Sequence, residues 1–528
     1  MEINRRKYPV GIQTFENIIK DSYIYVDKTD LVYKLAHTAK YVFLSRPRRF
    51  GKSLLSTTLC SYFRGDRELF EGLKIMDFES EWKKYPVIHL DLSTAKGQDS
   101  PQMLQQRLSL LIKPYFEQYG RDPEEKTPGA QLQGTITRAN KQSGTNVILI
   151  IDEYDAPLLE VLHEKEQLEG MRKVMQEFYQ PLKACERMVQ FCFLTGITRF
   201  SQLSIFSTLN NILNVSMDPA FATICGITEK ELTTEMSEDI ALLAEEYECT
   251  FDEMHERLKK QYDGYHFSEN SEEVYNPYSL MNCFLQRKIK NYWFESGTPT
   301  FLFQQMKRFK TDITKMDEIV ASEAAFYRPT ENLTDALPLL YQAGYLTIKE
   351  YKPRLKAYSL QIPNKEVRIG FTEGLLPVYS GLTSDSVKLG CAYKMWDALE
   401  EGNVDLAMNE LKAFLAGVPY VEGFKEKLKD AATKEGFYEC TFYLILSMLN
   451  VYVQTQVKCR TGRTDMIVLA DKAIYVFEFK VNDTTDAALA QINENKYAEQ
   501  FATDRRDIVK VGVSFDIDTW TIKEWKVE

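Results

Sequence analysis

The stretch from Tyr41 to Leu55, YVFLSRPRRFGKSLL, constrains the fold of this chain more than any other. An apolar run ends in a short loop, Gly51, Lys52 and Ser53 follow, and a helical pattern begins at Leu54. A strand, a turn and a helix N-terminus in this order form a phosphate-binding loop, in which backbone N–H groups, the helix dipole and one lysine hold a triphosphate. The sequence therefore predicts ATP at this loop, with the Ser53 hydroxyl on Mg²⁺.

The composition limits the classes of protein to consider. A chain of 528 residues is long enough for about three domains. The net charge of -11 argues against a broadly basic nucleic-acid coat but leaves room for a local basic groove. Nine cysteines without a CxxC pair are typical of reduced cytosolic proteins. The N-terminal residues lack a signal-peptide pattern, and no apolar run approaches the roughly 18 residues of a membrane helix, so we expect a cytoplasmic protein without membrane contact.

The run from Asn146 to Glu153, NVILIIDE, predicts a buried parallel strand that ends in two acids. Asp152 is expected to hold Mg²⁺, directly or through water, and Glu153 to polarise the water that attacks the γ-phosphate. The alternative is that both acids only cap the next helix, but the Gly-Lys-Ser sequence makes such a coincidence a poor explanation.

A further apolar run, Val189 to Leu194, leads into Thr195 and Arg199. In ATPases with an additional strand between the phosphate loop and the acidic strand, a polar residue here senses the γ-phosphate, and Thr195 is the candidate. Arg199 is expected to supply positive charge to the transition state, with a surface salt bridge as the alternative. Residues 87–92 and 212–215 are two more strand candidates. Strands that alternate with helices predict an α/β domain with a parallel P-loop NTPase sheet.

Six motifs in this spacing resemble a known family: YVDKT, SRPRRFGKS, ILIIDEYDAPL, LTGITRFS, YDGYHF and VYNPYSL. The chain resembles the bacterial AAA-ATPase-like family that is usually fused to a C-terminal nuclease-like domain. The resemblance implies an ATPase core whose phosphate loop reads Arg-Arg-x-Gly-Lys. Arg46 stands where the usual signature has glycine, and in this variant Arg46 and Arg49 join the nucleotide-binding loop with Gly51 to Leu54.

The middle of the chain, residues 229–375, predicts a helical lid and a winged-helix-like unit. The order of a helix at 337–340, a hairpin at 344–363 and a helix from Asn364 fits that unit. Such a unit can bind DNA, but the acidic chain offers no clear basic recognition helix, so we favour packing or protein contact. Residues 376–425 are expected to be a helical linker.

The C-terminal region, 426–528, predicts three consecutive strands after a helix. Asp465 begins the second strand, and Glu478 and Lys480 lie on one face of the third. A hairpin would bring the three together, with two carboxylates for Mg²⁺ and a lysine to activate water. This is the pattern of the PD-(D/E)XK nuclease superfamily. The alternative is an exposed hairpin with solvated charges.

Three other residues of this region are compared with the pattern. Glu435 and Glu439 are candidates for the helix acid of such folds. Gln491 lies on a following helix, but Asn495 stands where related nucleases have tyrosine, and Tyr497 comes later.

Taken together, the sequence predicts an ATPase domain at 1–228 and a restriction-endonuclease-like α/β domain at the C-terminus. ATP with Mg²⁺ would control a metal-dependent phosphodiesterase site. We favour DNA over RNA as the nucleic acid and expect a protein partner or a homo-oligomer. The alternative function is a non-catalytic nucleotide switch that uses the nuclease fold only for interaction.

Overall fold

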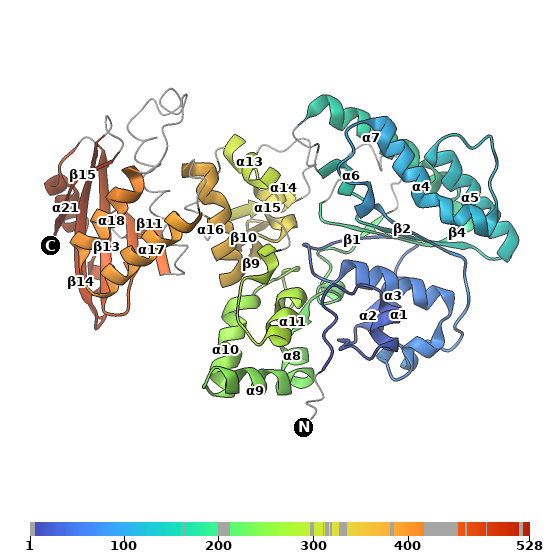
Figure 1. Cartoon of the computed structure of the whole chain (residues 1–528), viewed down its shortest axis with the longest axis horizontal. Coiled ribbons are helices and arrows are strands. Elements are labelled where there is room, and N and C mark those ends of the chain that lie inside the picture. The colour runs from blue at the N-terminus through green and yellow to red at the C-terminus, as the bar shows by residue number, and fades with distance from the viewer. Residues whose placement is uncertain are drawn as a thin grey trace. The chain divides into compact units, whose positions relative to one another are not determined.

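The computed structural model describes most of the chain: residues 6–159, 161, 164–198, 212–295, 300–309, 311, 316, 319–326, 335–380, 385–416, 452–459, 462–481, 483–516 and 521–528. The chain divides into two compact units. The first is Met1–Trp293 with Val320–Asn364, and the second is Phe294–Ile319 with Lys365–Glu528. Each unit has its own central sheet (Figure 1).

A five-stranded sheet in the order β2-β3-β4-β1-β5 forms the centre of the first unit. All four pairings are parallel. The strands are β1 (Tyr41–Ser45), β2 (Val87–Asp91), β3 (Val147–Asp152), β4 (Val189–Gly196) and β5 (Leu213–Asn214). The predicted parallel α/β sheet is confirmed, and β4 lies between the strand of the phosphate loop and the acidic strand.

Helices cover both faces of this sheet (Figure 1). One face carries α1 (Phe15–Lys20), α2 (Thr29–Ala36) and α3 (Lys52–Arg64), and the other carries α4 (Pro101–Tyr119), α5 (Pro128–Ser143) and α7 (Lys165–Ala184). A short helix, α6 (Ala156–Leu159), follows β3. Local signals set the helix ends: Ser100 and Thr127 accept from the first turns of α4 and α5, each of which begins with proline.

The remainder of the first unit begins with three helices, α8 (Glu229–Glu235), α9 (Ser237–Glu246) and α10 (Phe251–Tyr262). Capping boxes start α8 at Thr228 and α10 at Thr250. A short antiparallel pair, β6 (Ile227–Thr228) and β7 (Val274–Tyr275), precedes α11 (Pro277–Gln286) and α12 (Tyr292–Glu295). Their apolar faces share one core.

The expected order of helix, hairpin and helix is present in α15 (Leu337–Ala343), β9 (Thr347–Lys352), β10 (Ala357–Gln361) and α16 (Lys365–Ser380). Strand β8 (Ile319–Ser322) completes a sheet in the order β8-β10-β9. Two shorter helices are α13 (Thr300–Arg308) and α14 (Glu323–Phe326). The expected linker begins inside a helix, because α16 extends to Ser380, and α17 (Asp385–Glu400) and α18 (Val404–Ala416) follow.

The second unit contains a five-stranded mixed sheet in the order β11-β12-β13-β14-β15. Its strands are β11 (Tyr452–Cys459), β12 (Gly462–Leu469), β13 (Ala473–Val481), β14 (Asp507–Asp516) and β15 (Thr521–Val527). Only the β13–β14 pairing is parallel. Helix α21 (Thr485–Glu494) connects these two strands and packs on them. The predicted hairpin of β12 and β13 is confirmed.

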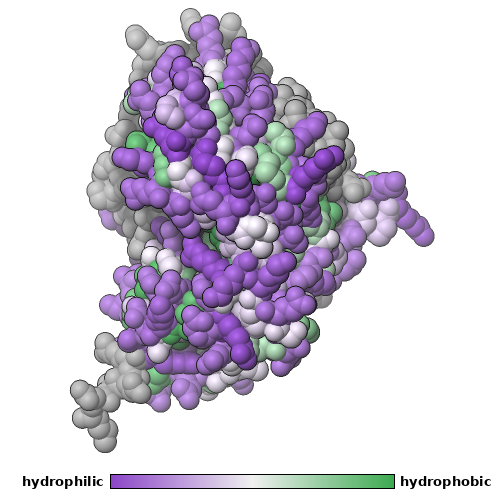
Figure 2. Space-filling model, turned by 90° about the vertical axis from the view of Figure 1, so that its right-hand side faces the viewer, coloured by the Kyte–Doolittle hydropathy of each residue, from purple (hydrophilic) through white to green (hydrophobic). Residues whose placement is uncertain are grey.

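Hydrophilic side chains dominate the face drawn in Figure 2, where apolar side chains form small separate groups. In the part of the chain that the structure describes, no helix is both long and apolar enough to cross a membrane.

Candidate ATP and nuclease sites

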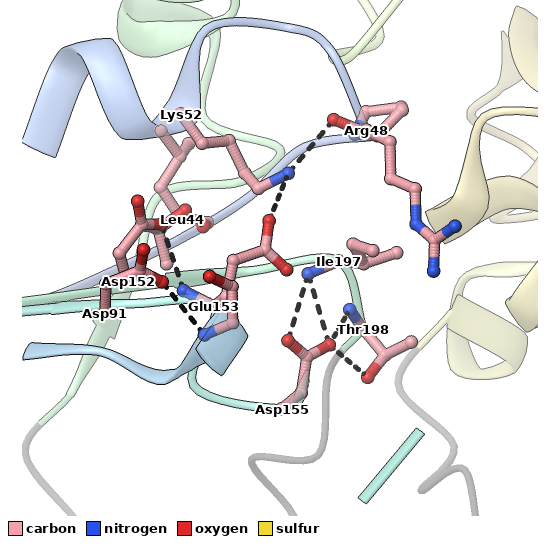
Figure 3. A network of polar contacts seen from close by, with 12 residues as sticks. Leu44, Arg48, Lys52, Asp91, Asp152, Glu153, Asp155, Ile197 and Thr198 are labelled. Carbon is pink, nitrogen blue, oxygen red and sulfur yellow. Dashed lines mark hydrogen bonds and ion pairs between the residues drawn. The ribbon is translucent and has the colours of Figure 1, made fainter. Parts of the chain in front are cut away.

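Lys52 and Glu153 meet at the carboxyl edge of the parallel sheet (Figure 3). Lys52 begins α3, Glu153 follows β3, and Lys52 Nζ lies 3.4 Å from Glu153 Oε1. The same amine donates to the carbonyl of Pro47 at 3.1 Å. The Lys52 side chain is only 4% exposed, and these two partners offset the free-energy cost of burying its charge.

Glu153 is held in an unusual state. Its backbone adopts a φ of 50°, the left-handed region that a glutamate seldom occupies. Burial alone would raise the pKa of its carboxyl, but Lys52, Lys96 and Arg48 outweigh that effect and hold the pKa below its usual value. Its Oε2 is buried without a hydrogen-bond partner among the described residues. The lowered pKa keeps Glu153 ionised at neutral pH, and one of its oxygens has no hydrogen-bond partner in the described part of the chain.

The Asp152 carboxylate lies beside the Ser53 side chain in the first turn of α3. Burial raises the pKa of its carboxyl to about 6, an effect opposed by a hydrogen bond with the Ser53 side chain and reinforced by the charges of Glu153 and Asp91. A hydroxyl and a carboxylate in contact are oxygen ligands of the kind that Mg²⁺ prefers. Ser53 and Asp152 also line one cleft of about 260 Å³.

In the second unit, Asp465 and Glu478 come together through the hairpin register. Met466 pairs with Phe477, which places the two acids opposite each other on neighbouring strands. Asp465 Oδ2 accepts from the Phe479 N–H at 2.8 Å. Lys480 Nζ lies 3.0 Å from Glu478 Oε1. The carboxylates and the lysine thus form one cluster, as the strand spacing predicts.

Burial raises the pKa of both carboxyl groups in this cluster. It raises the pKa of Glu478 to about 7, with Asp465 reinforcing the shift and Lys480 opposing it. It also raises the pKa of Asp465, against the hydrogen bond from Phe479 and the charge of Lys480. Glu478 is 1% exposed, and its Oε2 has no hydrogen-bond partner among the described residues. Burying two neighbouring carboxylates in their charged form is unfavourable, and a cation beside them would offset that free-energy cost.

Comparison with known proteins identifies a domain around each of these two clusters. Residues 9–206 match the family model described as Predicted AAA-ATPase, and residues 433–525 match the PD-(D/E)XK nuclease superfamily model. The chain is 31% identical over 534 residues to an Azotobacter chroococcum mcd 1 protein described as "Uncharacterized protein in vnfD 5'region". That alignment covers 100% of this chain and 99% of the relative. The chain belongs to the AAA-ATPase-like family with a C-terminal PD-(D/E)XK nuclease superfamily domain. The resemblance inferred from the motifs is thereby confirmed.

Thr195 of the AAA-ATPase-like domain lies at the end of β4, beside β1. Its hydroxyl donates to the Leu44 carbonyl at 2.8 Å, and its side chain is fully buried. Its role as a γ-phosphate sensor stays a prediction. Arg199, the second candidate of this segment, lies outside the described residues.

Arg46 and Arg49, the two loop arginines predicted to bind nucleotide, differ in their surroundings. Arg46 is 1% exposed, and its guanidinium donates to the carbonyls of Ser45, Ser216 and Phe221 at 2.8–2.9 Å. These contacts give Arg46 a structural role in the loop. Arg49 is exposed and lies over an aromatic ring.

Asp91 is a functional candidate that sequence reasoning missed. It ends β2 in register with Asp152, and both carboxylates line the cleft that Ser53 borders. The available signal was an acid at the end of an apolar strand, the same signal that identified Asp152.

Asp155, which follows the two acids of the ATP site in the chain, connects β3 to the end of β4. Its carboxylate accepts from the N–H groups of Ile197 and Thr198 and from the Thr198 hydroxyl, the last two at 2.6 and 2.7 Å (Figure 3). Burial raises its pKa to about 6, although the Thr198 contacts oppose this. Asp155 therefore holds together the two strand ends that carry Glu153 and Thr195.

In the nuclease superfamily domain, Tyr497 contacts Gln491 although it stands two residues after the position of the usual tyrosine. The Tyr497 hydroxyl accepts from Gln491 Nε2 at 3.4 Å and from Asn495 Nδ2 at 2.9 Å. Lys496, at a φ of 54°, turns the chain back after α21 and makes this contact possible. Glu435 and Glu439 lie outside the described residues.

Both sites suit the groups that the family implies. Gly51, at a φ of 89°, precedes the helix start at Lys52, and a Cβ placed on it would meet no other described residue within 4 Å, which leaves room for a phosphate group. No group of three or more His, Cys, Asp or Glu side chains suited to a metal occurs in the described ranges. The oxygen ligands that could hold a divalent cation are the Ser53–Asp152 pair at one site and Asp465 with Glu478 at the other, because hard cations prefer hydroxyl and carboxylate oxygens.

Proposed function

We propose that the AAA-ATPase-like domain binds and hydrolyses ATP with Mg²⁺, and that its nucleotide state controls phosphodiester cleavage in the nuclease superfamily domain. The observation that carries the proposal is the meeting of Lys52, Glu153, Asp152 and Ser53 at one strand edge. These residues supply a phosphate-binding cation, a base and two metal ligands, which are the components that ATP hydrolysis requires.

Each residue of the ATP site has a distinct role in this proposal. Lys52 binds the β- and γ-phosphates, and Ser53 and Asp152 hold Mg²⁺. Glu153 accepts the proton of the attacking water, since its pKa is held low and its Oε2 is unpartnered among the described residues. Thr195 senses the γ-phosphate, and Arg199 supplies charge to the transition state.

The second site would act on a nucleic-acid backbone, with DNA favoured over RNA. Asp465 and Glu478 hold a divalent cation, whose contribution is to polarise the phosphodiester and the attacking water. Lys480, 3.0 Å from Glu478, orients that water. The buried Glu478 Oε2, which has no partner in the described part of the chain, supports the assignment, because a neutral or solvated hairpin would not need to bury it.

The decisive experiment measures phosphate release by the full chain with ATP and Mg²⁺, in the presence and absence of DNA. Cleavage of the same DNA is followed in parallel with ATP, ADP or a non-hydrolysable ATP analogue. We expect phosphate release that requires Mg²⁺ and DNA cleavage that depends on which nucleotide is present. ATP binding without phosphate release would favour the non-catalytic switch. DNA cleavage that is the same with every nucleotide would contradict the proposal that nucleotide state controls the nuclease site.

A further inference from the structure

The phosphate-binding loop is contacted along its whole length by residues that lie far later in the chain but in the same compact unit. Five consecutive loop residues take part, and each has its own late partner. The pairs are Arg46 with Phe267, Pro47 with Gly344, Arg48 with Trp293, Arg49 with Tyr278, and Phe50 with Tyr265. We call the five late residues the loop clamp.

Arg46 anchors the start of the loop. Its guanidinium carbon lies 4.2 Å from the centre of the Phe267 ring, in addition to its hydrogen bonds to main-chain carbonyls. Phe50 anchors the other end, with its ring edge-on to Tyr265 at 4.6 Å and to Phe267 at 5.4 Å. Aromatic and cation–π contacts of this kind are directional, so they favour one loop shape over others.

The middle of the loop is held through its backbone and its proline. Trp293 Nε1 donates to the Arg48 carbonyl at 3.2 Å. A Cβ added at Gly344 would come within 2.7 Å of the Pro47 side chain, so glycine is what allows this close approach. Because the Pro47 carbonyl accepts from Lys52 Nζ, the position of this part of the loop also sets the position of the lysine.

Arg49 has a strained backbone conformation, which its contact with the loop clamp must stabilise. Its φ of 66° lies in the left-handed region, where a residue with a Cβ is strained, whereas Gly51 reaches a φ of 89° without that penalty. The guanidinium carbon of Arg49 lies 4.6 Å from the centre of the Tyr278 ring. The stack on Tyr278 therefore opposes the relaxation of Arg49 into an ordinary backbone conformation.

We propose that the loop clamp positions the phosphate-binding loop for ATP, and that Tyr278 is a positioning residue that keeps Arg49 in its left-handed conformation. This inference rests on the proposed ATP binding and adds a determinant outside the loop itself. Nucleotide affinity then depends on residues of α11 and its neighbours, which do not belong to the parallel sheet.

A double-mutant cycle tests the inference in the full chain. Tyr278→Leu is made alone and together with Arg49→Gly, and Kd for ATP is measured by calorimetry. We expect Tyr278→Leu to weaken binding by about three- to fivefold in the wild-type background, as expected for a cation–π contact of an exposed arginine. In the Arg49→Gly background the same substitution should change Kd by less than about twofold, because glycine reaches a positive φ without Cβ strain and presents no guanidinium to the ring. Tyr278→Phe, which keeps the ring, should bind ATP like the wild type.

The control is Phe116→Leu, which removes the ring that Arg121 covers at 5.2 Å elsewhere in the same unit. It should leave Kd unchanged. In steady-state kinetics Tyr278→Leu should raise KM far more than it lowers kcat, since Glu153 keeps its position. If Tyr278→Leu changes Kd equally in both backgrounds, or does not change it, the proposed role of the loop clamp is wrong, even though the wild type binds ATP. Failure of the wild type to bind ATP would instead remove the proposed function, and the clamp with it.

Discussion

The Nζ of Lys52 lies 3.4 Å from Oε1 of Glu153, and both side chains are largely shielded from solvent. This ion pair joins the first residue of α3 to the residue that follows β3. The lysine is the leading cause that holds the pKa of Glu153 below its usual value against the effect of burial. The residue assigned to bind phosphate thus also keeps the proposed base ionised, which couples the first two predictions.

Lys52→Ala should abolish measurable ATP binding, because the loop then lacks its phosphate-binding cation. Isothermal titration calorimetry on the purified variant measures this directly. Lys40→Ala is the matched control, since Lys40 forms an exposed ion pair with Glu186 next to the same sheet. Unchanged ATP affinity in Lys52→Ala would contradict the assignment of the loop.

Glu153→Gln should bind ATP and release phosphate about 10²–10⁴ times more slowly, the usual cost of losing a general base. Asp152 remains to hold the metal, so affinity should change little. Single-turnover phosphate release separates chemistry from binding. Glu186→Gln, at an exposed glutamate, serves as the control. A turnover equal to that of the wild type would move the base to another residue.

Asp263 should make the first unit less stable as the pH rises. Burial raises the pKa of its carboxyl to about 7, reinforced by Glu273 and Glu229 and opposed by the Gly264 N–H and Lys259. The folded state then keeps a proton that the unfolded chain loses near its ordinary pKa of 3.8, so stability falls between about pH 4 and pH 7.

Asp263→Asn removes this titration. Between pH 5 and pH 8 the wild type should lose about 3 kcal/mol more unfolding free energy than the variant. Calorimetric unfolding at the two pH values measures the difference, with the exposed Glu256→Gln as control. Parallel pH profiles for the wild type and Asp263→Asn would show that Asp263 ionises normally in the folded protein.

Asp465→Asn should lower Mg²⁺- or Mn²⁺-dependent DNA cleavage at least about 100-fold and leave ATP hydrolysis nearly intact. The amide oxygen can still accept from the Phe479 N–H, so the hairpin keeps its geometry while the metal loses a charged ligand. The control is Asp471→Asn, in the exposed turn between the same two strands. Cleavage that survives Asp465→Asn would remove the nuclease assignment and leave the ATPase proposal standing.

Local patterns in the sequence predicted much of the fold. The apolar runs that lead to Ser45, Asp152 and Thr195 became β1, β3 and β4, because a strand buried on both faces needs continuous apolar side chains. The spacing of Glu478 and Lys480 predicted their shared face, since side chains alternate along a strand.

Two features of the candidate sites depend on contacts between residues that no pattern of neighbouring residues in the sequence relates. Asp91 joins the ATP site only because β2 pairs with β3 in register. Tyr497 contacts Gln491 only because the backbone at Lys496 adopts a φ of 54°. A glycine at that position would have indicated such a turn in the sequence, but the residue is a lysine.

By itself, then, the sequence determined the strands next to both sites, the phosphate loop and the positions of Asp152, Glu153, Asp465 and Glu478, since strand and helix periodicity and loop chemistry act over neighbouring residues. Only the tertiary structure decided the aromatic partners of Arg46 and Arg49. Arg46 lies over Phe267 and Arg49 over Tyr278, and packing, not spacing along the chain, brings each pair together. Such contacts form where separate elements bury their surfaces against each other, so no local pattern in the chain can specify them.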